Sequence, residues 1–365
     1  MGCSPLALYL FEKSEYRLRL GNKNKLTYFV LLSTCTIFAD KFLLKKYSMN
    51  RILLSFLILS VVISCSCPVK EVKIEKETIL YSVKGADSLY LDKYVSSAVS
   101  KPEACVIFLF GGGFVGGKRD AKDYISYFNS LAESGYTVVS IDYRLGMKGV
   151  SKESLATPEQ FVGQLKYTID LAVEDLYDAT SYVLKSTDWN IDPSRVIISG
   201  SSAGAVSVLQ AEYDLVNKSE LSRKLPEGFN YAGVISFAGA VLSLNGDLAF
   251  SEKPCPVMLF HGNADANVPY DKMVMGDFGF YGSKHIAFKL KENNLPFCFY
   301  NVNNAAHEIA ETPMSDNVDE IKVFIDKFVL RKQPLFFEST VEQIGKPELR
   351  KDFELNDYIN TNYGN

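Results

Sequence analysis

A serine flanked by small residues marks the point where an apolar, strand-like run gives way to a helix-like segment. Residues 200–204 read Gly-Ser-Ser-Ala-Gly, the Gly-x-Ser-x-Gly pattern of a nucleophile held on a sharp turn. The glycines are needed because side chains beside such a turn would collide. The turn lifts the Ser202 hydroxyl clear of the sheet and places the Ala203 N–H at a helix start, where negative charge is favoured. We predict that Ser202 is a nucleophile; the alternative is a structural turn with serines as polar filler.

Three consecutive glycines follow an earlier apolar run. Residues 105–110 lead directly into Gly111, Gly112 and Gly113, and without side chains this backbone can turn its N–H groups inward, as an oxyanion hole requires. We expect Gly112, Gly113 and Ala203 to supply the donors. A phosphate-binding loop is the alternative, but no Gly-Lys-Ser/Thr follows at the required spacing and the glycines do not open a helix.

A nucleophilic serine needs a general base, and the chain contains three histidines. His285 lies inside a helix-like segment, and His261 ends a strand, where the ordinary role of a histidine is to hold a turn. His307 follows the strand-like residues 297–302, so it can reach the carboxyl edge of the sheet, where Ser202 also lies. We therefore predict that His307 is the base.

The carboxylate that orients this histidine is expected on a neighbouring loop. Asp265 follows the preceding strand, where it can accept the imidazole N–H and stabilise the imidazolium. Asp142 and Glu308 are competing carboxylates, but Asp142 ends an earlier strand and Glu308 is too close in sequence to His307 to orient it easily. The predicted triad is therefore Ser202, Asp265 and His307.

The elements that must position these residues alternate along the chain. Short runs rich in Val, Ile and Phe are apolar at nearly every position, which is typical of strands buried on both faces of a parallel sheet. Helix-like stretches separate them, and this alternation predicts an open, mainly parallel sheet with helices on both faces. We predict strands at 74–83, 89–94, 105–110, 137–142, 195–199, 232–237, 257–260 and 297–302, and helices at 121–134, 158–185, 203–216, 283–293 and 317–330.

Together these motifs resemble the esterase branch of the α/β-hydrolase superfamily, the carboxylesterase and hormone-sensitive-lipase-like group. The resemblance covers residues 70–332 and includes the chain order Ser202, Asp265, His307. It also rests on Phe-Gly-Gly-Gly-Phe at 110–114, Asp-Tyr-Arg-Leu at 142–145, Asp-Pro-Ser-Arg at 192–195, and His-Gly-x-x-Asp at 261–265 followed by Val-Pro at 268–269.

The resemblance implies an α/β-hydrolase fold with an eight-stranded, mostly parallel sheet, and ester hydrolysis through an acyl-serine. This sequence departs from the family at Phe110, where the family usually has a histidine that steadies the glycine loop by hydrogen bonding. We expect no cofactor and no metal, since the sequence has no CxxC motif or Cys/His cluster.

The segment before the predicted strand at 257–260, which Asp265 follows, bears on the size of the substrate. Only residues 239–254 stand where lipases often insert a lid, so we expect no large lid and an open site that suits short acyl groups on bulky alcohols. This favours an acetyl- or feruloyl-type esterase that acts on carbohydrate. Residues 146–157, Phe114 and the aromatic-rich stretch 270–281 either line the pocket or pack against the core. A serine peptidase of the same fold and a non-catalytic binding module remain alternatives.

The charge of the chain is unevenly distributed. Residues 1–64 hold nine of the 39 basic and three of the 43 acidic residues, which leaves 30 against 40 beyond them. Such an acidic body argues against nucleic acid as a partner, because a phosphate backbone favours clustered Lys and Arg. No stretch of 18 uninterrupted apolar residues follows Lys70, which argues against several membrane spans.

Residues 49–65 have the features of an export signal. Arg51 is followed by a mainly apolar run over 52–63 and then by Ser64 and Cys65. The end of this run resembles a bacterial lipobox, which implies that Cys65 is the lipid-modified first residue of an exported protein anchored to a bacterial membrane. An ordinary signal peptide cleaved nearby is the alternative.

The chain therefore divides into three predicted parts. Residues 1–64 are a leader, in which 1–48 is a start-site artefact upstream of the true start at Met49 and 49–64 is the lipoprotein signal. Residues 65–332 form the catalytic domain, and 333–365 form a polar C-terminal tail. Outside the leader region, Cys105, Cys255 and Cys298 lie in or beside apolar runs, so we expect buried free thiols.

Overall fold

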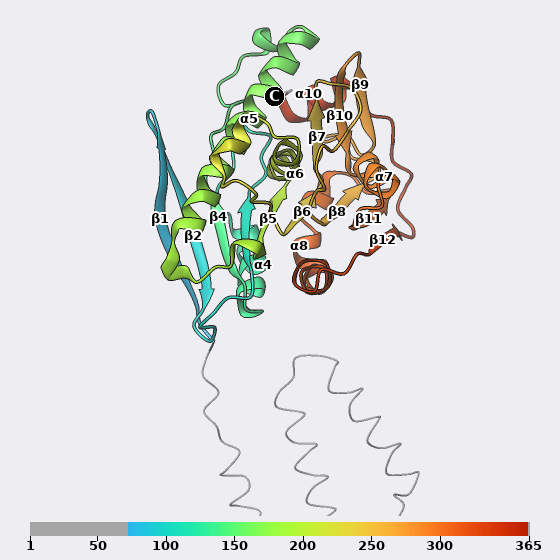
Figure 1. The fold of residues 1–365 in the computed structure, drawn as a ribbon. Helices are drawn as coiled ribbons and strands as arrows, with labels where there is room; N and C mark the ends of the chain where they lie inside the picture. The colour runs from blue at the N-terminus through green and yellow to red at the C-terminus, as the bar shows by residue number, and fades with distance from the viewer. Residues whose placement is uncertain (1–71, 364–365) are drawn as a thin grey trace, which may run out of the picture. The chain divides into compact units, whose positions relative to one another are not determined.

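A nine-stranded sheet forms the centre of the described chain, which comprises residues 72–363 in a computed structural model (Figure 1). The strands are β1 Ile74–Lys84, β2 Asp87–Ser96, β3 Cys105–Leu109, β4 Thr137–Ile141, β5 Val196–Ser201, β6 Gly233–Phe237, β8 Val257–Gly262, β11 Phe297–Asn303 and β12 Phe336–Glu342. Their order in the sheet is β1-β2-β4-β3-β5-β6-β8-β11-β12. β1 pairs antiparallel with β2, and β2 with β4, whereas the strands from β4 to β12 run parallel.

Helices cover the sheet in two groups. Helix α5 packs beside α6, and α4 contacts α8 and α9. The helices are α4 Lys122–Glu133, α5 Pro158–Lys185, α6 Ala203–Val216, α7 Ser283–Glu292, α8 Pro313–Asp316, α9 Val318–Phe324 and α10 Leu355–Tyr363. Shorter turns are η1 Lys152–Leu155, η2 Thr187–Trp189, η3 Pro193–Arg195, η4 Leu221–Lys224, η5 His307–Ala310 and the π-helical η6 Ile325–Leu330.

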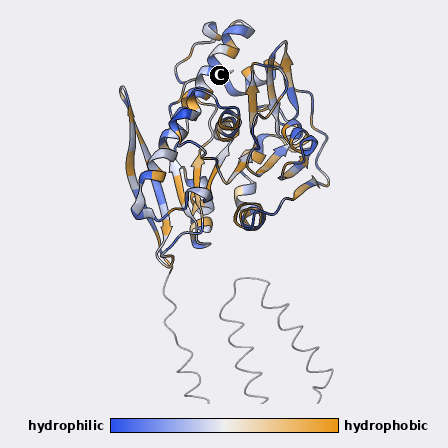
Figure 2. Cartoon of the chain, viewed as in Figure 1, coloured by the Kyte–Doolittle hydropathy of each residue, from blue (hydrophilic) through white to orange (hydrophobic). Residues whose placement is uncertain are grey.

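The central strands explain why two groups of helices are needed. Every residue of β3, β4, β5, β6 and β8 is buried, and Figure 2 shows hydrophobic residues concentrated in these strands. A strand that is apolar and buried at every position must be covered on both faces. The predicted α/β architecture, with a mainly parallel sheet and helices on both faces, is therefore confirmed, and all eight predicted strands are present.

A second, smaller sheet was not expected from the sequence. Its strands are β7 Ala240–Ser243, β9 Lys272–Met275 and β10 Phe278–Gly282, and they pair antiparallel in the order β7-β10-β9. The link between β9 and β10 is the two-residue turn Gly276-Asp277, in which Gly276 has a φ of +60°. A Gly-Asp pair between two apolar runs is a hairpin signal, so the sequence carries a local mark of this hairpin.

The aromatic residues offered as pocket lining are mainly part of the core. Phe114, Phe280 and Tyr281 are buried, with at most 2% of each residue exposed. Packing against the core, one of the two alternatives considered for these residues, therefore accounts for them.

Two details of the prediction need correction. The sheet has nine strands rather than eight, and the ninth lies within residues 333–365. Strand β12 extends the sheet by parallel pairing with β11, from Phe297 opposite Phe336 to Asn303 opposite Glu342. This segment is therefore not a detached tail. Because β12 is exposed at the sheet edge, it lacks the continuous apolar run by which the buried strands are predicted.

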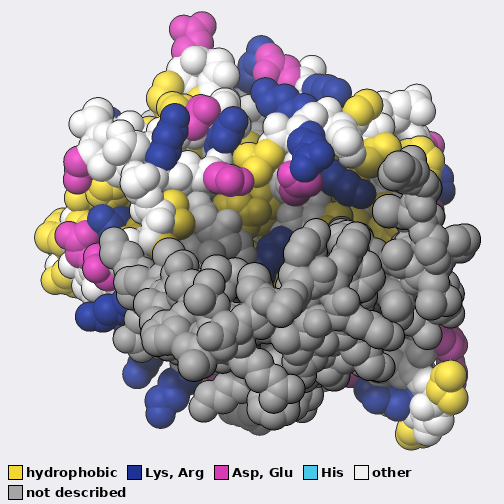
Figure 3. Space-filling view, turned by 90° about the horizontal axis from the view of Figure 1, so that it is seen from below, with side chains coloured by type: hydrophobic (Ala, Val, Ile, Leu, Met, Phe, Trp, Pro, Cys, Tyr) yellow, Lys and Arg dark blue, Asp and Glu magenta, His cyan; other side chains and the backbone are white. Residues whose placement is uncertain are grey.

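Both signs of charge share the surface of the described residues. Figure 3 shows Lys and Arg side chains interspersed with Asp and Glu on the part of that face that is visible. Ion pairs join charged side chains of the described residues, as in the pair of Lys84 with Asp178 at 2.5 Å. Among the described helices, none is both long and apolar enough to cross a bilayer. Met49 and Cys65, and with them the predicted export signal, lie outside the described residues.

The three cysteines beyond the leader are buried free thiols, as predicted. One of them adjoins an unusual carboxyl group. The Cys255 N–H donates to Glu212 Oε1 on α6 at 2.7 Å, and Glu212 is only 4% exposed. Burial raises the pKa of this carboxyl from 4.5 to about 7, because a charged form is poorly solvated there.

We expect Glu212→Gln to stabilise the protein at high pH only. Between pH 4.5 and 7 the folded protein retains a proton that the unfolded chain releases, so the free energy of unfolding falls as pH rises through this window. The neutral amide removes this loss, which amounts to on the order of 3 kcal/mol at pH 8 and almost nothing at pH 4. Urea denaturation at both pH values measures the difference. An equal gain at pH 4 and pH 8 would contradict the titration of Glu212.

Candidate active site

Ser202 occupies a strained turn between β5 and α6. Its φ of 52° and ψ of −118° lie in a region that residues with a side chain rarely adopt. Two hydrogen bonds hold it there: the Ser202 N–H donates to Phe237 O, and the Val206 N–H donates to Ser202 O, each at 2.9 Å. The turn joins the end of a buried strand to the start of a helix, as the sequence predicted.

The glycines that flank the turn are required by close approach. A Cβ on Gly204 would lie 2.1 Å from Leu109 O, and one on Gly200 would lie 2.4 Å from the carbonyl carbon of Gly204. Both distances are far below van der Waals contact. The spacing Gly-x-Ser-x-Gly thus lets the start of α6 pack directly against β3.

The predicted triad residues come together at the carboxyl edge of the sheet. His307 Nε2 lies 2.8 Å from Ser202 Oγ, and His307 Nδ1 lies 2.7 Å from Asp265 Oδ2. We assign the proton to Nδ1 because an ionised carboxylate only accepts hydrogen bonds. His307 Nε2 is then free to accept the hydroxyl proton of Ser202, as a general base must.

The environment of Asp265 favours its ionised form. Its Oδ1 accepts from the Asn267 N–H at 2.7 Å and from the Val268 N–H at 3.0 Å. Burial alone would raise the pKa of this carboxyl, but the imidazoles of His307 and His261 outweigh burial and hold the pKa below its usual range. The fully buried carboxylate can therefore orient His307 and stabilise its protonated form.

His261 has a second role that the sequence did not indicate. Its fully buried imidazole places Nε2 3.3 Å from both Asp265 Oδ2 and Val268 O. Both of these atoms are acceptors, so Nε2 carries the proton, and Nδ1 accepts from the Ser283 hydroxyl at 2.8 Å. His261 thus holds the turn, as expected, and also contacts the predicted acid. Its position four residues before Asp265 was the only signal in the sequence.

The side chains of the other candidates are engaged with other partners. Asp142 accepts from Arg119 Nη1 at 2.7 Å, and Glu308 accepts from the Ala306 N–H at 2.9 Å. His285 contacts Asp247 at 2.5 Å.

The glycine loop lies directly against the serine turn. A Cβ on Gly111 would lie 3.2 Å from Ser202 Cβ. Gly112 and Gly113 have φ values of 126° and 60°, which glycine adopts without strain. Ala203 is the first residue of α6, so its N–H has no acceptor within the helix. These positions suit an oxyanion hole, and the donor roles of Gly112, Gly113 and Ala203 stay a prediction.

Aromatic residues surround the loop at the site of the family's usual histidine. The Phe110 ring stacks on Tyr143, with ring centroids 4.5 Å apart and an interplanar angle of 27°. The Tyr143 hydroxyl donates to Phe110 O at 2.7 Å, and the Gly111 N–H donates to the Tyr124 hydroxyl oxygen at 3.1 Å. Stacking and two tyrosine hydrogen bonds therefore hold the loop that the absent histidine would otherwise steady.

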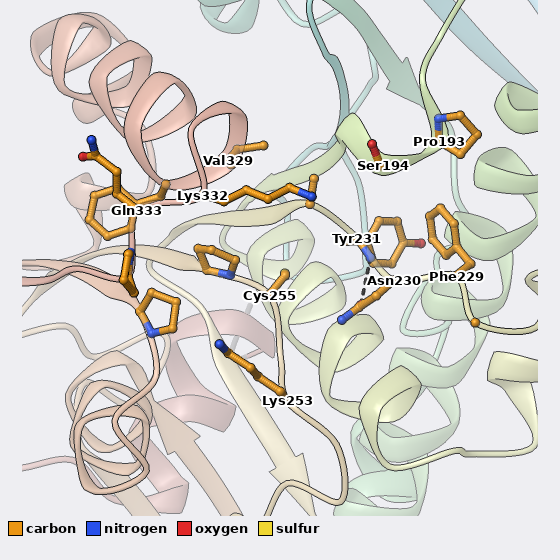
Figure 4. Close-up of a pocket in the computed structure, with 16 residues that line it drawn as sticks. Pro193, Ser194, Phe229, Asn230, Tyr231, Lys253, Cys255, Val329, Lys332 and Gln333 are labelled. Carbon is orange, nitrogen blue, oxygen red and sulfur yellow. Dashed lines mark hydrogen bonds between the residues drawn. The ribbon is translucent and has the colours of Figure 1, made fainter.

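A cavity of about 510 Å³ lies at the opposite edge of the sheet (Figure 4). Its lining includes Pro193, Ala232, Pro256 and Pro296, which precede β5, β6, β8 and β11 respectively. These are the amino ends of the parallel strands, whereas Ser202 follows the carboxyl end of β5. This cavity is therefore not the site of the triad. Within residues 72–363, no group of three or more His, Cys, Asp or Glu side chains is arranged to hold a metal ion.

Comparison with known proteins agrees with this architecture. The BD-FAE family model matches residues 91–241, a stretch that contains the glycine loop and the serine turn. The apo form of Thermogutta terrifontis esterase 2 is similar, with 18% identity, a TM-score of 0.50, and coverage of 71% of this chain and 96% of that chain. The same esterase phosphorylated by paraoxon has 20% identity and a TM-score of 0.49, and the match covers 71% of this chain and 95% of that chain. At this identity the likeness concerns the fold. With its mainly parallel sheet, helices on both faces and serine turn after β5, the chain has the α/β-hydrolase fold.

Proposed function

We propose that this α/β-hydrolase is a serine esterase that cleaves a carboxylic ester through an acyl-serine intermediate. The observation that carries the proposal is the continuous hydrogen-bonded path from Ser202 Oγ to His307 and on to Asp265, with distances of 2.8 and 2.7 Å. Hydroxyl, imidazole and carboxylate in this geometry perform acyl transfer on several unrelated folds. The similar Thermogutta protein is named an esterase, which favours an ester over an amide substrate.

We propose a mechanism in which the three groups act in sequence. His307 Nε2 removes the Ser202 proton as Oγ attacks the ester carbonyl, while Asp265 stabilises the imidazolium. The N–H groups of Gly112, Gly113 and Ala203 receive the oxyanion, and each such donor is worth about 3 kcal/mol of transition-state stabilisation. The imidazolium then protonates the leaving alcohol, and a water activated by the same nitrogen releases the acid.

The surroundings of the site favour a short acyl group. Of residues 239–254, the structure forms only the short strand β7, so no helical cap is inserted there. Tyr363, which lies near Gly113, belongs to an aromatic cluster with Phe161, Phe280 and Tyr358, whose ring centroids lie 5.6 to 6.4 Å apart. We infer that this cluster restricts the room for a long acyl chain. An acetyl- or feruloyl-type ester of a carbohydrate is the substrate class that we propose.

We further propose that the protein is exported and lipid-anchored to a bacterial membrane through Cys65. The support is the sequence alone: a positive charge, a mainly apolar run and a lipobox-like ending within residues 49–65. Such an anchor would place the hydrolase where glycan esters outside the cytoplasm are accessible. N-terminal mass spectrometry of the native protein tests this, since a peptide from residues 1–48 would contradict both the start at Met49 and the anchor.

Labelling by a fluorophosphonate tests the proposed activity. We expect a covalent adduct on the peptide that contains Ser202, because only an activated serine hydroxyl attacks this phosphorus centre. Assays with acetyl, butyryl, feruloyl and long-chain esters are expected to show preference for the short or feruloyl groups. Absence of both labelling and hydrolysis would favour a binding module, and faster cleavage of a peptide anilide than of any ester would favour a peptidase.

A further inference from the structure

The last part of the chain contacts all three loops of the candidate active site. We call residues 343–363 the C-terminal strap; they run from the end of β12 through α10. In Figure 1, α10 lies at the same end of the molecule as β9 and β10. The strap reaches the loop of Asp265, the loop of His307 and the glycine loop.

The loop of Asp265 is bound by the last turn of α10. Asn362 Nδ2 donates to Asn267 O at 2.8 Å. The Thr361 hydroxyl lies 2.8 Å from Ala266 O and 2.7 Å from Asp357 O of its own helix, so its single proton is shared between these two acceptors. The same Asn267 residue donates its N–H to Asp265 Oδ1 at 2.7 Å. Two side chains of α10 therefore contact the carbonyl oxygens of the peptide units 266–267 and 267–268, and the N–H groups of both units donate to Asp265 Oδ1.

The glycine loop lies beside the same turn of the helix, with room between them for about one methyl group. A Cβ on Gly113 would lie 3.7 Å from Asn362 Oδ1 and 3.9 Å from Tyr363 Cε1, which is ordinary van der Waals contact. Asn362 thus lies between Gly113, a predicted oxyanion donor, and the loop that carries Asp265.

The loop of His307 is bound by the middle of the strap. Asn304 Nδ2 donates to Pro347 O at 2.6 Å, and Asn304 Oδ1 accepts from the Leu349 N–H at 2.7 Å. Asn304 is 8% exposed, stands three residues before His307 and has a φ of 56°. A positive φ costs free energy for a residue other than glycine. The two hydrogen bonds to the strap satisfy the Asn304 side-chain amide in this conformation.

Apolar packing, rather than these polar contacts, attaches α10 to the domain. Tyr358 is 3% exposed, and its ring centroid lies 5.6 Å from those of Phe161 on α5 and Phe280 on β10. A buried aromatic side chain of this size supplies much of the binding free energy of a short helix. The polar groups at the end of α10 can therefore be altered while the helix stays in place.

We propose that the C-terminal strap belongs to the catalytic apparatus, with Thr361 and Asn362 as positioning residues for Asp265. This inference rests on the proposed esterase function. The two side chains act through the peptide units at 266 and 267, and not on the substrate. Because a displacement of about 1 Å in a reacting group costs about 10²-fold in rate, release of these peptide units lowers turnover although the triad itself is intact.

The double variant Thr361→Ala/Asn362→Ala tests the proposal. We expect kcat for a short ester to fall by at least tenfold and KM to change by less than twofold, with an unchanged melting temperature. Thr361→Ser in an otherwise unaltered chain retains the hydroxyl and is expected to keep the kcat of the natural protein. Asn360→Ala, at an exposed position of the same helix, is the matched control. A kcat equal to that of this control would overturn the proposal.

Hydrogen exchange separates this proposal from the esterase function. In the double variant we expect faster exchange at the Asn267 and Val268 amides, which donate to Asp265, and unchanged exchange at Val206 in α6. Unchanged exchange at the Asn267 and Val268 amides would refute the proposed positioning role of the strap, whether or not the protein hydrolyses esters. An inactive natural protein that is not labelled by a fluorophosphonate would instead refute the esterase function.

Discussion

Ser202→Ala is expected to lower kcat for a short-chain ester by about 10⁵-fold. The variant removes the only hydroxyl within hydrogen-bond distance of His307 Nε2 among the described residues. Hydrolysis by a bound water without an acyl-serine is the residual route, aided only by the oxyanion donors and by substrate binding. Steady-state kinetics with p-nitrophenyl acetate measure the loss.

Ser201→Ala shows which serine of the pair is the nucleophile. Ser201 Oγ donates to Ala310 O at 2.8 Å, so its hydroxyl is engaged with η5 and not with the imidazole. We expect this variant to lose at most about tenfold in rate, through loosening of the loop that follows His307. The nucleophile assignment would be wrong if Ser202→Ala retained the turnover of the natural protein, or if Ser201→Ala lost the greater part of it.

Asp265→Asn is expected to lower kcat by about 10⁴-fold while the fold stays intact. The asparagine amide can donate to His307 Nδ1, which favours the imidazole tautomer that carries its proton on Nε2. That nitrogen then cannot accept the Ser202 proton. The negative charge that stabilises the imidazolium is also lost. Kinetics with the same ester, together with circular dichroism, measure activity and fold separately.

Asp142→Asn is the matched control, because Asp142 was the other aspartate compatible with the sequence. Its carboxylate pairs with Arg119 at 2.7 Å and does not contact the triad. We expect activity within about threefold of the natural protein and a loss of stability below about 1 kcal/mol, since the ion pair is partly exposed. Equal losses of activity in Asp265→Asn and Asp142→Asn would contradict the assignment of the acid.

Local pattern was sufficient for eight strands of the main sheet and for the glycine-flanked turn at Ser202. Helices α5 and α6 begin and end at the predicted residues, Pro158–Lys185 and Ala203–Val216. For α5 the reason is chemical: Thr157 and Gln160 form a reciprocal capping box, and Pro158 opens the first turn. The serine turn was predictable for a similar reason, since close approach of α6 to β3 excludes any residue with a side chain at Gly204.

Other features of the site depend on residues far apart in sequence. Phe110 stacks on Tyr143, 33 residues away, and neither residue alone indicates that pairing. Strand β12 lacks the continuous apolar run of a buried strand because it is exposed at the sheet edge. The contact of His261 with Asp265 spans only four residues, but it depends on how the loop after β8 folds. Both side chains are polar enough to face solvent, so their types alone do not indicate that they meet.

The sequence by itself determined the candidate catalytic groups: a serine on a glycine-flanked turn, a glycine loop, and an aspartate and a histidine that each follow a strand of the main sheet. Local sterics and hydrophobic burial specify these features, and both can be inferred from neighbouring residues. Only the tertiary structure decided what holds them in register. Asn362 meets Asn267 across 95 residues, and such a contact leaves no local pattern because its free energy depends on where the whole fold places the two side chains.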